Sequence, residues 1–244
     1  MVGAGSHPAR AMAMESLYEY GSRAGFWRLH RLFTARDLPV TVFGVAKALE
    51  MNPPAVEAML AADWEIASHG LRWIDYQDVP EATERAHIAE AIALHTRLTG
   101  SRPLGWYQGR TSPNTARLVV EEGGFVYDAD SYADDLPYYD TRFGKPQLIV
   151  PYTLDVNDMK IVALNGFTEG EQFFRYLRDT FDQLVEEGGR MMSVGLHARI
   201  AGRPGRARAL ARFLDHVIAS GDAWVARRID IACHWLEVHP YENR

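Results

Sequence analysis

The stretch Trp64-Glu65-Ile66-Ala67-Ser68-His69-Gly70-Leu71-Arg72-Trp73 joins a short apolar run to a histidine and then to a glycine. The run predicts a buried strand over residues 64–68, and Gly70 lets the chain turn directly after it. His69 is therefore expected at the carboxyl end of a strand, where α/β folds gather their reactive groups. Four residues beyond His69, where a second metal-binding histidine would lie, the sequence has Trp73.

Composition excludes several classes of protein. The chain has 244 residues, 47% hydrophobic and 24% charged, which is ordinary for a globular protein of one large or two small domains. Its net charge of -6 argues against nucleic acid as a partner, because phosphate binding needs a basic face. The sequence contains no apolar run near the roughly 18 residues of a membrane span. One cysteine and an N-terminus unlike a signal peptide lead us to expect a cytoplasmic protein.

Further along the chain, short apolar runs alternate with helical patterns. Strands are expected at 39–45, 64–68, 103–107, 125–128, 147–150, 191–196 and 223–226. Helices are expected at 53–62, 80–98, 169–187, 206–218 and 229–236, and from Ser112-Pro113 to Gly123-Gly124. Residues 1–14 read as an irregular segment and 15–244 as one domain. This alternation predicts an α/β fold with a parallel sheet. A barrel is favoured over an open sheet, since the expected strands are followed by no glycine-rich phosphate loop.

Polar side chains follow four of the expected strands. Because the carboxyl ends of parallel strands share one face, we expect them to meet at one mouth: His69; Trp106, Tyr107 and Arg110; Asp128 and Asp130; His197. Each has a structural alternative. The histidines could be ordinary loop residues, Trp73 and Trp106 could be core aromatics, and Arg110 could only satisfy carbonyls or pair with Asp128.

Four longer segments resemble one known family: residues 16–25 (SLYEYGSRAG), 104–111 (LGWYQGRT), 130–138 (DSYADDLPY), and 192–197 (MSVGLH) with 202–206 (GRPGR). They resemble the polysaccharide deacetylases of carbohydrate esterase family 4, and within it the metal-independent allantoinase branch. The resemblance covers nearly everything from Met14 onward and implies a distorted (β/α)7-type barrel. The family's first motif is a strand ending in acidic residues. It should precede residues 18–21 and has no counterpart here, so the resemblance implies a chain that lacks this strand.

The resemblance also implies roles for individual residues. His197 would be the general acid or base, and His69 would position or polarise water or the carbonyl. Asp128 is a weak candidate for the base that the family places on its first strand. Arg110 would hold substrate oxygens in a pocket shaped by Trp73, Trp106, Tyr107 and Tyr132. The family's histidine-x-x-x-histidine motif falls on His69 and Trp73, so we expect no catalytic metal and no cofactor.

Three functions remain open at this stage. The first is opening of the hydantoin ring of allantoin to give allantoate in purine degradation, by a homo-oligomer acting on a small ureide. The second is metal-dependent de-N-acetylation of an amino-sugar polymer, which predicts a histidine at position 73 and normally goes with export. The third is a catalytically impaired barrel remnant with a structural or subunit-partner role. A serine hydrolase is disfavoured because the sequence has no G-x-S-x-G elbow.

Overall fold

The computed structural model describes residues 9–163 and 166–242, which fall into two compact units. Unit 1 consists of Met1–Asp37 and Thr153–Trp224, and unit 2 of Leu38–Tyr152 and Val225–Arg244. Each unit is built from segments that are distant in the sequence. Among the described residues, no helix is both long enough and apolar enough to cross a membrane.

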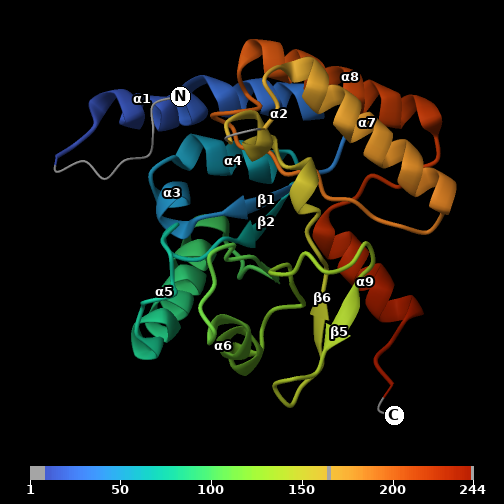
Figure 1. Ribbon diagram of the computed structural model, residues 1–244. Helices are drawn as coiled ribbons and strands as arrows, with labels where there is room; N and C mark the ends of the chain where they lie inside the picture. The colour runs from blue at the N-terminus through green and yellow to red at the C-terminus, as the bar shows by residue number, and fades with distance from the viewer. Residues whose placement is uncertain (1–8, 164–165, 243–244) are drawn as a thin grey trace. The chain divides into compact units, whose positions relative to one another are not determined.

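Unit 2 contains a mainly parallel sheet with strand order β1-β2-β3-β4-β6-β5 (Figure 1). The strands are β1 (Thr41–Gly44), β2 (Glu65–Ser68), β3 (Gly105–Trp106), β4 (Tyr127–Asp128), β5 (Tyr138–Asp140) and β6 (Gln147–Ile149). The five expected strands of this unit are confirmed, each shorter than its apolar run. The unexpected strand, β5, pairs with β6 antiparallel at the edge of the sheet. Its sequence alternates too briefly to be recognised as a strand.

The helices of unit 2 are α3 (Ala46–Glu50), α4 (Pro53–Ala61), α5 (Glu81–Thr99), α6 (Thr115–Glu122) and α9 (Arg228–Val238). Four of these helices were expected from the sequence, and the short helix α3 was not. Pro53 begins α4, as expected of a proline in the first turn. Gly100 and Gly123 end α5 and α6 in the left-handed conformation that favours glycine.

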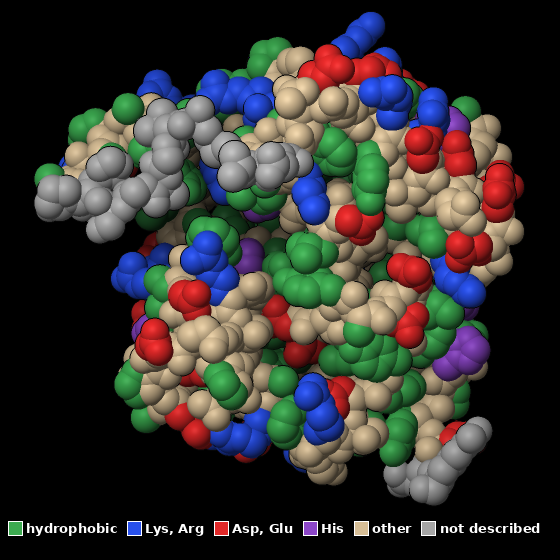
Figure 2. All heavy atoms as spheres, in the orientation of Figure 1, with side chains coloured by type: hydrophobic (Ala, Val, Ile, Leu, Met, Phe, Trp, Pro, Cys, Tyr) green, Lys and Arg blue, Asp and Glu red, His purple; other side chains and the backbone are tan. Residues whose placement is uncertain are grey.

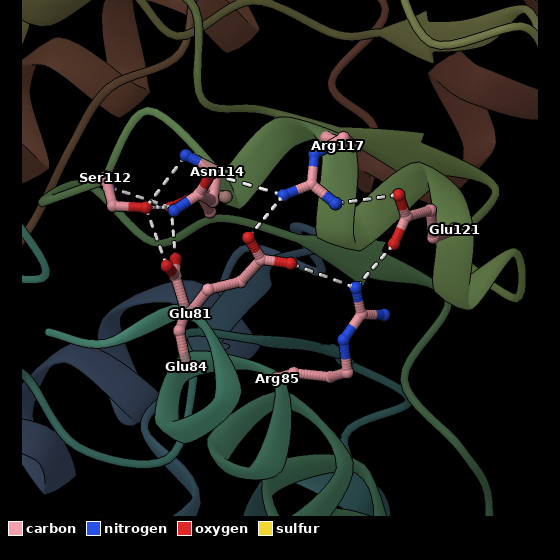
Figure 3. Close-up of polar contacts among 8 residues, drawn as sticks. Glu81, Glu84, Arg85, Ser112, Asn114, Arg117 and Glu121 are labelled. Carbon is pink, nitrogen blue, oxygen red and sulfur yellow. Dashed lines mark hydrogen bonds and ion pairs between the residues drawn. The ribbon is translucent and has the colours of Figure 1, made fainter.

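Helix α6 begins later than its sequence indicates. Ser112 was expected to cap it, but the Ser112 hydroxyl donates to the buried carboxylate of Glu84 on α5 at 2.6 Å. Figure 3 shows Glu84 reaching from α5 toward the residues that precede α6. Thr115 donates to the same carboxylate, and the helix starts there. The serine therefore joins the two helices and also keeps the expected type of capping contact, because its oxygen accepts the Asn114 N–H at 2.9 Å.

Strand register gives the sheet two distinct faces. Ser68, Trp106 and Asp128 lie side by side on adjacent strands, so their side chains point to one face. Residues one position further along, His69 and Tyr107, point to the other. The Phe43 ring confirms this assignment, because its centroid lies 6.3 Å from that of His69 and 4.9 Å from that of Tyr107. Because successive side chains of a strand point to opposite faces, His69 and Tyr107 share one face of the sheet, and Trp106 and Asp128 share the other.

Unit 1 is helical. It contains α1 (Met12–Tyr20), a π-helical turn (Gly21–Gly25), α2 (Phe26–Thr34), two short 3₁₀ turns (Leu154–Val156 and Asp158–Ile161), α7 (Gly170–Glu187) and α8 (Pro204–Ser220). Its core is formed chiefly by apolar residues of α7 and α8, with Phe173, Leu177 and Leu210 each at most 1% exposed. Over these two helices the surface in Figure 2 shows acidic and basic side chains intermixed. One ion pair, between Arg212 and Glu171, joins the two helices.

Three expectations about secondary structure are wrong. Residues 191–196 form no strand, and only Gly195 makes an isolated parallel bridge, with Asn157. Residues 223–226 are not in a strand either, and α9 begins shortly after them at Arg228. At the N-terminus, the segment 1–14 was expected to be irregular. Residues 1–8 lie outside the described residues, and α1 already begins at Met12.

Candidate active site

His69 directly follows β2 and is held in one orientation. Its backbone N–H donates to the Gly44 carbonyl at 2.9 Å, and its ring Nδ1 lies 2.9 Å from the Tyr107 carbonyl oxygen. A carbonyl can only accept, so Nδ1 carries the proton, and Nε2 is the lone-pair nitrogen of the neutral ring. Gly70 is required next, since its φ is +68° and a Cβ there would lie 2.4 Å from the Gln108 side chain. The expected order of a strand, then His69, then a turn at Gly70 is therefore confirmed.

Aromatic side chains surround His69 on its face of the sheet. The Tyr107 ring stacks on Tyr152 with centroids 5.1 Å apart, and its hydroxyl lies 3.1 Å from that of Tyr132. Burial, and then the hydrogen bond with Tyr132, raise the pKa of Tyr107. The Tyr107 phenol therefore stays neutral and can donate a proton in a hydrogen bond. Tyr132 is 48% exposed and forms the outer part of this aromatic group.

Trp73 and Arg110 form a stacked pair at the surface. The Arg110 guanidinium carbon lies 4.1 Å from the centre of the Trp73 indole, which is 44% exposed. The two loops that carry them are joined by a backbone hydrogen bond, in which the Tyr76 N–H donates to the Arg110 carbonyl at 3.2 Å. A guanidinium held over an aromatic face can still offer N–H donors to oxygen acceptors. This is the arrangement that recognition of a carbonyl, carboxylate or ureido oxygen requires.

The residues around His69 do not fit a catalytic zinc site. Such a site takes three protein ligands, and the position four residues after His69 is occupied by the stacked indole. Across residues 9–163 and 166–242, no group of three or more His, Cys, Asp or Glu side chains is arranged to hold a metal ion.

The structure separates Trp106 and Asp128 from His69. Trp106 is 1% exposed and packs with Ile88, Leu118 and Phe125, so it is a core aromatic and not a pocket wall. Asp128 is 4% exposed and shares the face of Trp106, opposite to that of His69. Burial, and then the charge of Asp130, raise the pKa of Asp128 well above its ordinary range. The role of Asp128 as the catalytic base stays a prediction, and the strand register places its side chain on the face of the sheet opposite to His69.

Asp130 is a further polar group of this site, noticed in the sequence but given no role. Its two carboxylate oxygens accept the backbone N–H groups of Gln108 at 2.7 Å and Gly109 at 2.6 Å. Burial raises the pKa of Asp130 to about 6, and the two N–H donors oppose that rise. The indole N–H of Trp106 acts in the same direction as these donors but lies outside hydrogen-bond geometry.

In unit 1, His197 is paired with an aspartate that sequence reasoning missed. Its Nδ1 lies 2.7 Å from Asp158 Oδ1, and Asp158 is fully buried. The other oxygen, Oδ2, accepts the backbone N–H groups of His197 at 2.8 Å and Ala201 at 3.0 Å. Asp158 therefore fixes the Nδ1–H tautomer and directs the basic Nε2 outward, as in general acid–base pairs. The only local signal was an acidic residue directly after Asn157.

The structure brings Tyr107, Tyr132 and His69 together, and Trp73 with Arg110, within unit 2. His197 belongs to unit 1. The expectation that both histidines share one mouth therefore stays a prediction.

The comparisons with known proteins identify the family. The polysaccharide deacetylase family model matches residues 8–125. A Schizosaccharomyces pombe protein named "Putative polysaccharide deacetylase" is 42% identical over 97% of this chain and 80% of its own length. The crystal structure of a "probable Polysaccharide deacetylase" from Pseudomonas aeruginosa PAO1 is 55% identical, with a TM-score of 0.96 over 99% of this chain and 82% of that one. The crystal structure described as "Puue Allantoinase" is 54% identical, with a TM-score of 0.95 over 98% and 82%.

The chain belongs to the polysaccharide deacetylase family. It is a hydrolase of that family, and the resemblance recognised in its sequence is confirmed. The α/β fold with a mainly parallel sheet is confirmed as well, since it matches the folds of these relatives; the unclosed sheet of unit 2 is compatible with a barrel.

Proposed function

We propose that this hydrolase opens the hydantoin ring of allantoin to give allantoate, a step of purine degradation. The observation that carries the proposal is the 54% identity, over 98% of the chain, to the structure named as an allantoinase. The family name alone would favour deacetylation. The stacked Trp73–Arg110 pair at the family's second histidine position favours a flat, oxygen-rich ligand instead.

The reaction adds one water to a cyclic amide. The water oxygen bonds to the ring carbonyl carbon, the ring C–N bond breaks, the leaving nitrogen takes a proton, and the carbonyl becomes a carboxylate. This sequence needs a base for the water, stabilisation of the oxyanion, and an acid for the nitrogen. His197 can supply the first and the last, because Asp158 keeps Nδ1 protonated and leaves Nε2 to accept and then return a proton.

Unit 2 supplies groups suited to the substrate itself. The Arg110 guanidinium offers paired N–H donors to ureido or carboxylate oxygens, and Trp73 presents an aromatic face beside it. The neutral Tyr107 phenol can donate to a carbonyl oxygen, and the lone pair on His69 Nε2 can accept a hydrogen bond from the attacking water and so position it. These roles are assigned to each group separately and can be tested one residue at a time.

The test is turnover of allantoin by the purified chain. ¹³C NMR monitors the reaction, because the signal of the hydantoin carbonyl is replaced by the signal of a carboxylate. The reaction is run with and without a chelator, and in parallel on an N-acetylglucosamine oligomer with release of acetate as the signal. We expect allantoin turnover that survives chelation. Acetate release that chelation abolishes would replace the proposal with de-N-acetylation, and a folded chain inactive on both substrates would favour the remnant.

A pair of variants identifies the reacting histidine. His197→Gln should abolish turnover. The matched control is His216→Gln, because His216 lies 2.6 Å from Asp182 in an exposed histidine–aspartate pair of α7 and α8. Equal loss in both variants would show that the assay follows unit 1 stability and not the chemistry of His197.

A further inference from the structure

We propose that Asp130 is a positioning residue that sets the tautomer and orientation of His69 through the backbone of residues 107–109. The inference rests on the proposed function only in so far as His69 takes part in the reaction. The geometric claim itself can be tested without any substrate.

The first contact in this relay is the carboxylate clamp. Asp130 accepts the N–H groups of two successive residues, Gln108 and Gly109, with one oxygen each, at 2.7 and 2.6 Å. Two short bonds from a charged acceptor fix the peptide plane between those residues far more firmly than neutral bonds would. Gly109 has a φ of +74°, so the clamp holds the chain in a conformation that it would otherwise leave readily.

The second contact leads from the clamped segment to the histidine. The carbonyl of Tyr107 is the acceptor for His69 Nδ1–H at 2.9 Å, and it belongs to the peptide unit whose N–H, on Gln108, is held by Asp130. Since the carbonyl and N–H of one peptide unit lie in a single plane, fixing the N–H fixes the direction of the carbonyl. The carbonyl in turn determines which ring nitrogen of His69 keeps its proton.

Asp128 supports the clamp from behind. Its Oδ1 accepts the backbone N–H of Asp130 at 2.9 Å, which orients the residue that bears the clamping carboxylate. Asp128 lies on the face of the sheet opposite to His69, so its effect on the histidine passes through Asp130 and the backbone of residues 107–109. The hydrogen bond between them is a structural reason for the presence of two mostly buried carboxyl groups, Asp128 and Asp130, so close together.

The experiment observes the His69 ring nitrogens by ¹⁵N NMR in histidine-labelled protein, with the signal assigned by its loss in His69→Gln. The wild-type chain should show one Nδ1–H tautomer. Asp130→Asn puts an amide NH₂ against one of the two backbone donors and should yield a mixture of tautomers. Asp130→Glu keeps the charge and should give an intermediate state, which provides a second reading if the asparagine variant does not fold. Asp134→Asn, an exposed aspartate on the same loop, should leave the signals as in wild type.

Unchanged His69 signals in folded Asp130→Asn or Asp130→Glu would overturn the proposal. Activity is a separate measurement: if allantoin is turned over, Asp130→Asn should lower kcat about tenfold and change KM little, as expected for a misplaced reacting group. If the wild-type chain does not act on allantoin, the proposed function fails, while the NMR result still decides the positioning role.

Discussion

The Asp158–His197 pair provides the sharpest test of the chemistry, through the single substitution Asp158→Asn. The asparagine is nearly isosteric and can keep its oxygen where Oδ2 accepts the N–H groups of His197 and Ala201. Its NH₂ then replaces Oδ1, 2.7 Å from His197 Nδ1. Two donors cannot face each other, so the imidazole must move its proton to Nε2. In that tautomer the ring can no longer accept a proton from water.

The size of the effect follows from what is lost. General acid–base catalysis contributes about 10²–10⁴-fold, and the same swap in a Ser-His-Asp triad costs about 10⁴-fold in kcat. We therefore expect kcat to fall by roughly 10²–10⁴-fold, which corresponds to about 3–5 kcal/mol. Stability should change much less. A charge-assisted bond is replaced by a neutral one, at a cost of about 1–2 kcal/mol, so Tm should fall by roughly 2–8 °C.

The assay is allantoin turnover over a range of pH, with thermal unfolding of the same samples. Asp182→Asn is the matched control, because Asp182 forms the exposed pair with His216 and its loss should leave kcat within about twofold. The reasoning would be refuted by a folded Asp158→Asn protein that retains kcat within about threefold of wild type.

Three further predictions concern unit 2. Arg110→Lys should raise KM about tenfold with little change in kcat, because a lysine neither stacks on the Trp73 ring nor donates as a planar fork. The control is Arg142→Lys, which alters an arginine over the Phe143 ring and should have no effect on kinetics. Gly105→Ala should cost about 1–3 kcal/mol in unfolding experiments, since its Cβ would lie 2.1 Å from a tyrosine ring, while Gly205→Ala has open space and should not destabilise. Burial raises the pKa of Asp130 from 3.8 to about 6, so the folded state binds this proton more tightly than the unfolded chain does. Its contribution to stability therefore falls as pH rises through that window; Asp130→Asn should remove the slope from Tm measured against pH, and an unchanged slope would contradict this.

Much of the fold was predictable because its signals are local. The long helices α5, α7 and α8 have apolar residues at helical spacing and end at Gly100, Gly188 and Gly221. The strands of unit 2 are apolar runs bounded by turn residues. Residues 191–196 have the same composition but form no strand, because a strand needs a neighbouring strand to pair with along its length. This segment forms only one isolated bridge, at Gly195, whose carbonyl accepts the Asp158 N–H.

Prediction of the site was less complete. His69 could be placed after a strand, and His197 and Arg110 could be chosen, from chain order and family resemblance. Trp73 and Trp106 could not be told apart, since each is a tryptophan beside an expected strand. One is 44% exposed beneath a guanidinium and the other 1% exposed in the core. The difference depends on which face of the sheet each side chain meets.

The sequence by itself determined the α/β class, the five parallel strands and the longer helices of unit 2, and the histidine at the end of β2, because hydrophobic periodicity and glycine stops act over a few residues. Only the tertiary structure decided the partners of those residues. Asp158 meets His197 across 39 positions of the chain, and Asp130 meets Gln108 across 22. Contacts over such distances arise from how the packed elements align, and that alignment leaves no mark in the local pattern around either residue.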